Sequence, residues 1–188
     1  KGRYPQDVLA IFGDHMPDNY EADLALISAP LDWAGSNYYT RSVIQPDATE
    51  PHIGFQCIRG DLPKTDMGWE VDPAGLGFFL RRMAEEYAPG LPQYVTENGM
   101  ANDDRVGSDG RVADPDRIAY FEGHLEEISR LVADGVPVRG YFAWSLLDNY
   151  EWAFGYSKRF GIIHVDYDSM TRTPKRSYLA WQDALKAR

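Results

Sequence analysis

The sequence places a carboxylate, Glu97, where covalent or acid–base chemistry is possible. Glu97 comes directly after segment 94–96, which is typical of a buried strand, and it precedes an Asn-Gly pair. A carboxylate at the mouth of a barrel strand can act as a nucleophile or as a base. The alternative is that Glu97 begins an ordinary Asn-Gly turn and is simply solvated.

A second carboxylate, Glu151, is followed by Trp152 in segment 145–156, which holds too many aromatic residues for a solvated loop. A carboxylate can accept two sugar hydroxyls, and an indole provides a flat apolar face and one N–H donor. The alternative is a hydrophobic cluster under a long loop, with Glu151 at its rim. Trp144 can be a core residue or a stacking platform, and Tyr39 can bond a carboxylate or simply pack.

The composition of the 188 residues narrows the class of ligand. A hydrophobic share of 44 % rules out intrinsic disorder, and no stretch approaches the ~18–20 apolar residues of a membrane helix. The formal net charge of −10 argues against a nucleic-acid partner, because no basic stripe is present. Aromatic residues make up 13 % of the chain and can stack on sugars, so carbohydrate is the leading ligand class.

Metal, cofactor and acyl-transfer chemistry find no support in the sequence, and we predict no metal and no cofactor. The histidines share no metal-ligand spacing, no Ser lies in a GxSxG motif, and neither a GxGxxG nor a GxxxxGK[ST] loop occurs. The lone Cys57 forbids an internal disulfide and a multi-Cys zinc site, and with the acidic composition it favours a cytoplasmic location. The histidines are His15, His52, His124, which we expect to be exposed, and His164, which we expect to be packed.

Strand-like and helix-like segments alternate along the chain, which predicts βα units on a parallel sheet and an α/β fold. Aromatic and β-branched residues indicate strands over 31–44, 91–99 and 136–147, and segment 161–167 indicates a strand or hairpin arm. The stretch 45–70 is rich in Pro, Gly and Asp, which predicts a loop.

Three longer helices have clear start signals. Each begins with a capping residue followed by proline, at 72–73, 114–115 and 173–174, and two short helices are expected within 5–17 and 19–28. The polar and aromatic candidates fall just after strand ends. In βα folds this edge of the sheet binds ligands, so we expect one site built from strand ends.

Three motifs in this order along the chain resemble those of the family 1 glycoside hydrolases, the β-glucosidase family. They are SNYYT at 36–40, YVTENG at 94–99, and GYFAWSLLDNYEWAFGYSKRFGIIHVDY at 140–167. The likeness extends from about Tyr4 to the end of the chain. It implies a (β/α)8 barrel and retaining hydrolysis of β-linked sugars.

The resemblance also implies roles for eight residues. Glu97 matches the nucleophile, which forms a covalent glycosyl-enzyme that water resolves, and Tyr39 matches the tyrosine that hydrogen-bonds this nucleophile. Glu151 and Trp152 match the pair that holds the outer hydroxyls of the non-reducing sugar. Glu151 with Phe160 implies unphosphorylated sugars, because a carboxylate would repel a 6-phosphate. The other matches are a wall residue, Asn37; the stacking platform, Trp144; a wall near the sugar's sixth carbon, Phe160; and a residue at the aglycone entrance, Trp69.

The second carboxylic acid that a retaining glycosidase needs is missing, because the family's Asn-Glu-Pro motif does not occur. About three βα units cannot close a barrel. We therefore expect residues 1–188 to be the C-terminal portion of a single catalytic barrel, with no separate second domain, acting on a β-glucoside or cello-oligosaccharide. Its expected partner is the missing N-terminal half of the barrel, and neither nucleic acid nor a membrane is expected. Galactosides and fucosides stay open as substrates; the alternative function is an inactive stand-alone fragment with at most weak sugar binding.

Overall fold

A computed structural model describes residues 2–51 and 53–187. His52, one of the histidines considered above, lies outside these residues. The chain divides into two compact units, the first made of 1–32 and 42–60 and the second of 33–41 and 61–188. All eight residues with a predicted role belong to the second unit.

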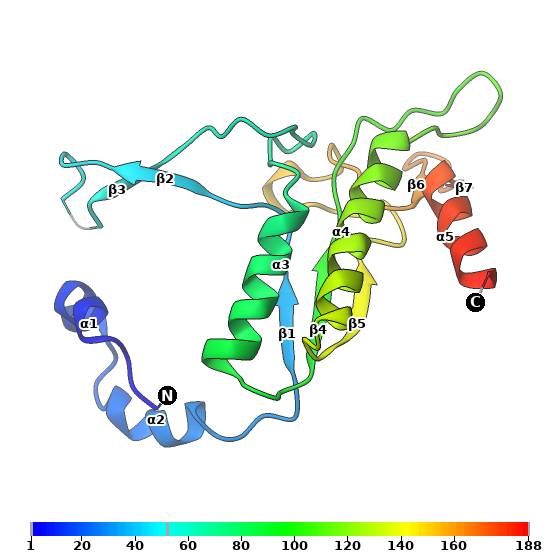
Figure 1. The fold of residues 1–188 in the computed structure, drawn as a ribbon. Helices are drawn as coiled ribbons and strands as arrows, with labels where there is room; N and C mark the ends of the chain where they lie inside the picture. Colours follow the sequence, from blue (N-terminus) through cyan, green and yellow to red (C-terminus); the bar gives the residue numbers. More distant parts are fainter. Residues whose placement is uncertain (1, 52, 188) are drawn as a thin grey trace. The chain divides into compact units, whose positions relative to one another are not determined.

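The first unit contains two short helices and a hairpin (Figure 1). The helices are confirmed as predicted, and none of their side chains is buried. The loop prediction for 45–70 is wrong in part, because its first residues complete one strand of an antiparallel hairpin and 55–58 form the other. The elements are α1 Gln6–Phe12, the turn η1 Gly13–His15, α2 Tyr20–Ile27, β2 Val43–Pro46 and β3 Phe55–Ile58.

The single strand predicted over 31–44 is two strands in the structure. β1 is Ala34–Asn37, and only the last two residues of the segment, Val43 and Ile44, belong to β2 of the first unit. After β1 the carbonyl of Tyr38 accepts a hydrogen bond from the side chain of Asn98, at 2.7 Å. The Asn98 side chain therefore occupies the acceptor that a backbone N–H of a neighbouring strand would otherwise use, and the β1–β4 ladder ends there.

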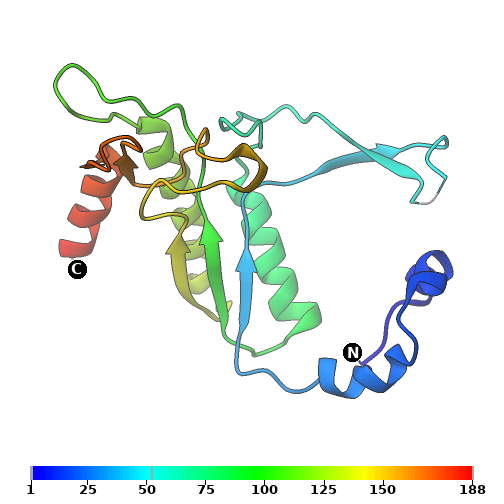
Figure 2. The same ribbon diagram turned by 180° about the vertical axis from the view of Figure 1, so that it is seen from behind.

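The second unit is built on a three-stranded parallel sheet in the order β1-β4-β5, as the alternating pattern predicted. β4 is Gln93–Asn98 and β5 is Val138–Ala143. Figure 2 shows the face of this sheet that lies away from its helices. Within the described residues β1 and β5 are the edges of the sheet, each paired on one side only.

Two helices cover the other face of the sheet (Figure 1). α3 is Pro73–Arg82, continued by the π-helical turn η2 Met83–Tyr87, and α4 is Pro115–Ala133. The predicted cap of α3 is confirmed, because the carboxylate of Asp72 accepts the N–H of Gly75 at 3.2 Å. Burying each large apolar side chain between helix and sheet contributes about 1.5–3 kcal/mol. This core consists of Tyr38, Leu76, Leu80, Val95, Leu131, Val136 and Val138.

The C-terminal part of the chain is a hairpin of β6 Ile163–Val165 and β7 Arg172–Pro174, followed by α5 Arg176–Lys186. The strand or hairpin arm predicted at 161–167 is confirmed. The predicted start of the last helix is wrong, because Pro174 pairs with Ile163 in the hairpin. The helix begins after that, and the carboxylate of Asp114 accepts the N–H of Ser177 at 2.9 Å.

The predicted environment is confirmed for His164 and wrong for His124. His164 is packed as expected, with 7 % of its surface exposed. The prediction that His124 is exposed is wrong, because it is fully buried on α4 with its ring centroid 4.0 Å from that of Tyr120. Burial lowers the pKa of His124, which keeps the ring neutral. Among the described residues no helix is both long and apolar enough to cross a bilayer.

Candidate active site

All eight residues singled out from the sequence line one hollow of about 630 Å³ at the carboxyl ends of the parallel strands. Asn37 is the last residue of β1, Glu97 is near the end of β4, and Trp144 directly follows β5. Parallel strands bring their carboxyl ends to one edge, which explains how residues so far apart in sequence meet. The eight are Asn37, Tyr39, Trp69, Glu97, Trp144, Glu151, Trp152 and Phe160.

At the base of the hollow, Tyr39 donates a hydrogen bond from Oη to Oε2 of Glu97, at 2.6 Å. Burial raises the pKa of Tyr39 well above its ordinary value, and the hydrogen bond and the charge of Glu97 raise it further. The phenol therefore stays protonated and remains a donor. Beside this pair, Thr96 donates from Oγ1 to Oδ1 of Asn37, also at 2.6 Å, which fixes the amide at the end of β1.

Three aromatic rings pack together next to Glu97. The ring centroid of Tyr39 lies 5.5 Å from that of Trp69 and 6.0 Å from that of Phe160, and the other two are 6.1 Å apart. Phe160 is only 2 % exposed. The cluster keeps the phenol of Tyr39 in one orientation and gives the hollow an apolar wall.

Glu151 and Trp152 lie on the loop that follows β5. The pKa of Glu151 is raised by burial and by the charge of Glu97. Trp152 is 82 % exposed and has a left-handed backbone with φ of 40°, at the start of the short turn η3 Trp152–Phe154. An indole with so much exposed surface is not part of a hydrophobic cluster under the loop, so the alternative reading of this pair fails for Trp152.

The loop that carries Glu151 is anchored by Asp148, whose carboxylate is fully buried. Asp148 accepts hydrogen bonds from Arg159 at 2.7 Å, from Lys175 at 2.8 Å and from the backbone N–H of Gly161 at 3.0 Å. The start and the end of the loop are thereby tied together. Asp148 was not among the residues predicted from the sequence, because a single Asp in a polar segment carries no signal of burial.

Asp148 belongs to a larger network of buried charges. Lys175 and Arg117 are fully buried and both bond the carboxylate of Asp104, Arg117 with two N–H groups. Arg117 also bonds Asp114, the residue that accepts the N–H of Ser177 at the start of α5. The network links the loop before α4, the loop after β5 and the start of α5.

Five further residues line the hollow and received no role from the sequence analysis. Four of them, all except Met67, lie in segment 145–156, where the density of aromatic residues was the signal that pointed to this region. Within the described part of the chain, no three His, Cys, Asp or Glu side chains gather in a way that could hold a metal ion. The five are Met67, Asn149, Tyr150, Ala153 and Phe154.

Chemically, the site combines an oriented carboxylate, a protonated phenol donor, a second carboxylate and several aromatic faces. Glu97 is presented to a ligand in the hollow with one oxygen held by Tyr39. The arrangement suits nucleophilic attack on a ligand that stacks on aromatic rings and donates hydrogen bonds to Glu151.

Comparison with known proteins identifies similar sequences over the whole chain. A family model described as "Glycosyl hydrolase family 1" matches residues 1–188. Beta-glucosidase A of Thermotoga maritima is 44 % identical over 188 residues, which cover 99 % of this chain and 41 % of the relative. The bifunctional beta-D-glucosidase/beta-D-fucosidase of Bifidobacterium breve is 43 % identical over 196 residues, covering 95 % of this chain and 42 % of the relative.

Solved structures give the same result. The family 1 β-glucosidase from Thermotoga maritima in complex with isofagomine lactam superposes with a TM-score of 0.92 at 44 % identity, covering 99 % of this chain and 41 % of that one. The β-glucosidase from the same organism in complex with noeuromycin has the same TM-score and identity, with 42 % of its length covered. The chain thus spans about 41 % of the length of the curated relatives it matches.

Proposed function

Because the chain belongs to glycosyl hydrolase family 1, we propose that it forms the nucleophile side of a retaining β-glucosidase active site. The family that the motifs predicted is confirmed. The fold class is confirmed as well, because the chain is an α/β part that matches about two fifths of a family 1 β-glucosidase barrel. The activity of the whole protein is a proposal, and the observation that carries it is the hydrogen bond from Tyr39 to Glu97 inside the aromatic hollow.

The proposed reaction has two displacements at the anomeric carbon of a β-glucoside. Glu97 attacks this carbon, the bond to the aglycone oxygen breaks, and an ester between the sugar and Glu97 forms. Water then attacks the same carbon and gives a proton to the carboxylate of the acid that protonated the aglycone, the ester bond breaks, and the carboxylate of Glu97 is restored. Tyr39 holds one oxygen of Glu97 so that the other oxygen faces the sugar.

The first displacement requires a carboxylic acid ~5–5.5 Å from the nucleophile that protonates the departing aglycone. We propose that this acid comes from an N-terminal portion of the same barrel, which also pairs with the edge strands β1 and β5. Residues 1–188 then belong to one catalytic barrel without a separate second domain. The alternative function is a stand-alone fragment with at most weak sugar binding.

The proposed substrates are β-glucosides and cello-oligosaccharides without a phosphate group. The names of the relatives, β-glucosidase A among them, support the sugar class. Glu151 in the hollow supports the lack of a phosphate, because its carboxylate would repel a 6-phosphate. We also propose a cytoplasmic location, since Cys57 is a free thiol and this chain offers no second cysteine with which it could form a disulfide.

The test is covalent labelling with 2,4-dinitrophenyl 2-deoxy-2-fluoro-β-glucoside, followed by intact mass spectrometry. Its leaving group departs without protonation, so the label reports on the nucleophile without the missing acid. Two samples are compared: the 188-residue chain alone, and a completed barrel in which the chain is fused behind the part of Thermotoga maritima β-glucosidase A that it does not match. A Glu97→Gln variant of the completed barrel is the control.

We expect the completed barrel to gain one fluoroglucosyl group on the peptide that contains Glu97, and the Glu97→Gln variant to gain none. We expect the chain alone to label very slowly and to hydrolyse cellobiose hardly at all. A label on another residue of the completed barrel would refute the assignment of the nucleophile. Rapid labelling and cellobiose hydrolysis by the chain alone would refute the need for an N-terminal portion.

A further inference from the structure

Asn98, next to Glu97 in the chain, has a fully buried side chain whose amide groups all have partners. Its Nδ2 donates to the carbonyl of Tyr38 at 2.7 Å and to the hydroxyl of Tyr120 at 2.9 Å. Its Oδ1 accepts the hydroxyl of Tyr141 at 2.6 Å. Because a carbonyl can only accept, the contact with Tyr38 fixes which end of the amide carries the nitrogen.

Tyr120 extends this arrangement to the other member of the nucleophile pair. Its hydroxyl accepts from Asn98 and donates to the backbone carbonyl of Tyr39 at 3.2 Å. The ring is 2 % exposed and packs against His124 on the same helix, so the hydroxyl is held in place from α4. A closed path therefore runs from Glu97 through Tyr39, Tyr120 and Asn98 back to Glu97.

The register of the sheet shows why Glu97 needs such support. Between Val95 and Asn98 the strand β4 has one more residue than β5, and between Val95 and Glu97 it has one more than β1. Glu97 thus lies in a bulge of β4 relative to both neighbouring strands. A bulge redirects a side chain but leaves part of the ladder unpaired, so its direction depends on other contacts.

We propose that Asn98 and Tyr120 are positioning residues that aim the Tyr39–Glu97 pair at the anomeric carbon. The proposal rests on the proposed function, in which Glu97 is the nucleophile. Neither residue touches the sugar; they act by fixing the backbone that carries Glu97 and the backbone that carries Tyr39. Small displacements of a reacting group lower rates steeply, about 100-fold for roughly 1 Å.

The main test is Tyr120→Phe in the completed barrel, because it removes one hydroxyl and keeps the buried ring. Tyr38→Phe is the matched control: its phenol is buried nearby and donates to the backbone of Asp72 at 2.7 Å, outside the closed path. We expect Tyr120→Phe to slow labelling by the fluoroglucoside about tenfold, and Tyr38→Phe by less than about twofold. Glucose binding, measured by calorimetry, is expected to stay unchanged in both variants.

A second comparison separates positioning from a general loss of structure. In a Tyr39→Phe background the phenol–carboxylate bond is absent and Tyr120 acts only through Asn98 on the backbone of Glu97, so Tyr120→Phe is expected to cost clearly less than in the original background. Asn98→Ala is a further variant expected to slow labelling at least as much as Tyr120→Phe; if it does not fold, Tyr120→Phe decides alone.

The proposal is overturned if Tyr120→Phe behaves like Tyr38→Phe, or if its cost is the same with and without the hydroxyl of Tyr39. It is also overturned if glucose binding weakens in parallel with labelling, because that pattern indicates damage to the whole site. Failure of the proposed function looks different: the completed barrel with the original sequence would then take no label on Glu97.

Discussion

Oη of Tyr39 lies 2.6 Å from Oε2 of Glu97, although the two residues are 58 positions apart in the chain. The pairing of Asn37 with Glu97 in the parallel sheet brings them together, because Tyr39 follows β1 by two residues. The phenol is the donor, since its pKa is raised by burial and by Glu97 itself. One carboxylate oxygen is thus held while the other is left for chemistry.

Replacing Tyr39 by Phe is therefore expected to slow formation of the glycosyl-enzyme. A hydrogen bond to a charged group contributes about 2 kcal/mol, which corresponds to roughly 30-fold in rate. The ring contacts with Trp69 and Phe160 are kept by Phe, so folding should be little affected. The measurement is the labelling rate of the completed barrel by the fluoroglucoside. A rate within about twofold of the original would show that the hydrogen bond does not aid attack.

As the pH is lowered, the affinity for glucose is expected to start falling at a higher pH than it would if Glu151 had the pKa of an ordinary Glu. The pKa of Glu151 is raised by burial and by the charge of Glu97, so its carboxylate takes up a proton at a higher pH than usual. The ionised form accepts hydroxyl donors and the protonated form loses part of this capacity. Binding should therefore be full at neutral pH and weaken as the pH falls through the raised pKa of Glu151.

Calorimetric titration with glucose over a pH series checks this expectation. In a Glu97→Gln variant the charge of Glu97 no longer raises the pKa of Glu151. The loss of affinity on the acid side of the pH series, the acid limb, should therefore shift to lower pH. In Glu151→Gln the limb should disappear and the affinity should drop about tenfold. An acid limb at the same pH in the original protein and in Glu97→Gln would mean that the two carboxylates do not interact.

The sequence alone predicted the sheet, its two covering helices and the edge at which the site forms. The failures have local physical causes. His124 was expected to be exposed because Glu122 and Glu126 flank it, but residues two apart on a helix face different directions, whereas Tyr120, four before it, shares its face. The hairpin of β2 and β3 was hidden because Pro and Gly in 45–70 resemble a loop in composition.

For the candidate site, too, the sequence predicted some residues and not others. Polar and aromatic residues after strand ends pointed to six of the eight assigned residues in the hollow, and the family resemblance added Trp69 and Phe160. The residues that hold the site from below were not found, because Asp104, Arg117, Asp148 and Lys175 are charged and would ordinarily be assigned to the surface. Only the folded structure shows that their charges compensate one another out of water.

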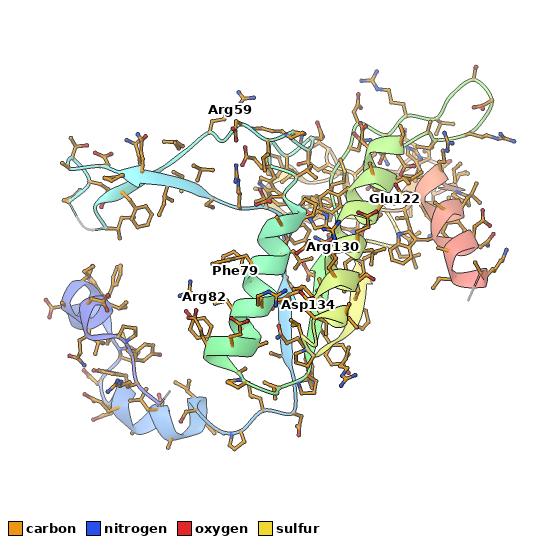
Figure 3. All side chains as sticks on the ribbon, viewed as in Figure 1. Arg59, Phe79, Arg82, Glu122, Arg130 and Asp134 are labelled. Atoms are coloured by element: carbon orange, nitrogen blue, oxygen red, sulfur yellow. The ribbon has the colours of Figure 1, made fainter. Side chains whose placement is uncertain are left out.

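The buried charges predict a large difference between two arginines of α4. Arg117 is fully buried and bonds Asp104 and Asp114. The side chain of Arg130, labelled in Figure 3, is 67 % exposed and pairs with Glu126 and Glu127. Arg117→Met removes the arginine from two buried carboxylates and leaves their charge only partly compensated, which should cost about 3–5 kcal/mol of unfolding free energy. Arg130→Met removes two ion pairs of an exposed arginine, each of which contributes less than about 1 kcal/mol.

The free energy of unfolding of the two variants is measured by denaturant unfolding of the completed barrel. The variants are directly comparable, because both arginines lie on α4 and both are replaced by Met. Arg117→Met is also expected to weaken glucose binding, because Asp104 shares Lys175 with Asp148, the anchor of the loop that carries Glu151. Equal losses of stability in the two variants would contradict the assignment of a compensated buried network.

Gly99 directly follows β4 and lies against the backbone of Trp144, the residue after β5. A Cβ built on Gly99 would lie 1.7 Å from the carbonyl oxygen of Trp144, which is far inside contact distance. The backbones cannot separate freely, because the N–H of Trp144 donates to the carbonyl of Asn98 at 2.8 Å. Gly99→Ala must therefore move the end of β4, and with it Glu97, away from β5. We expect a loss of about 3 kcal/mol or more in stability and at least about tenfold slower labelling.

Gly13→Ala is the matched control, because a Cβ there meets nothing within 4 Å and φ is −55°. Labelling of Gly99→Ala at the original rate would show that the close contact between the two strand ends does not determine the direction of Glu97.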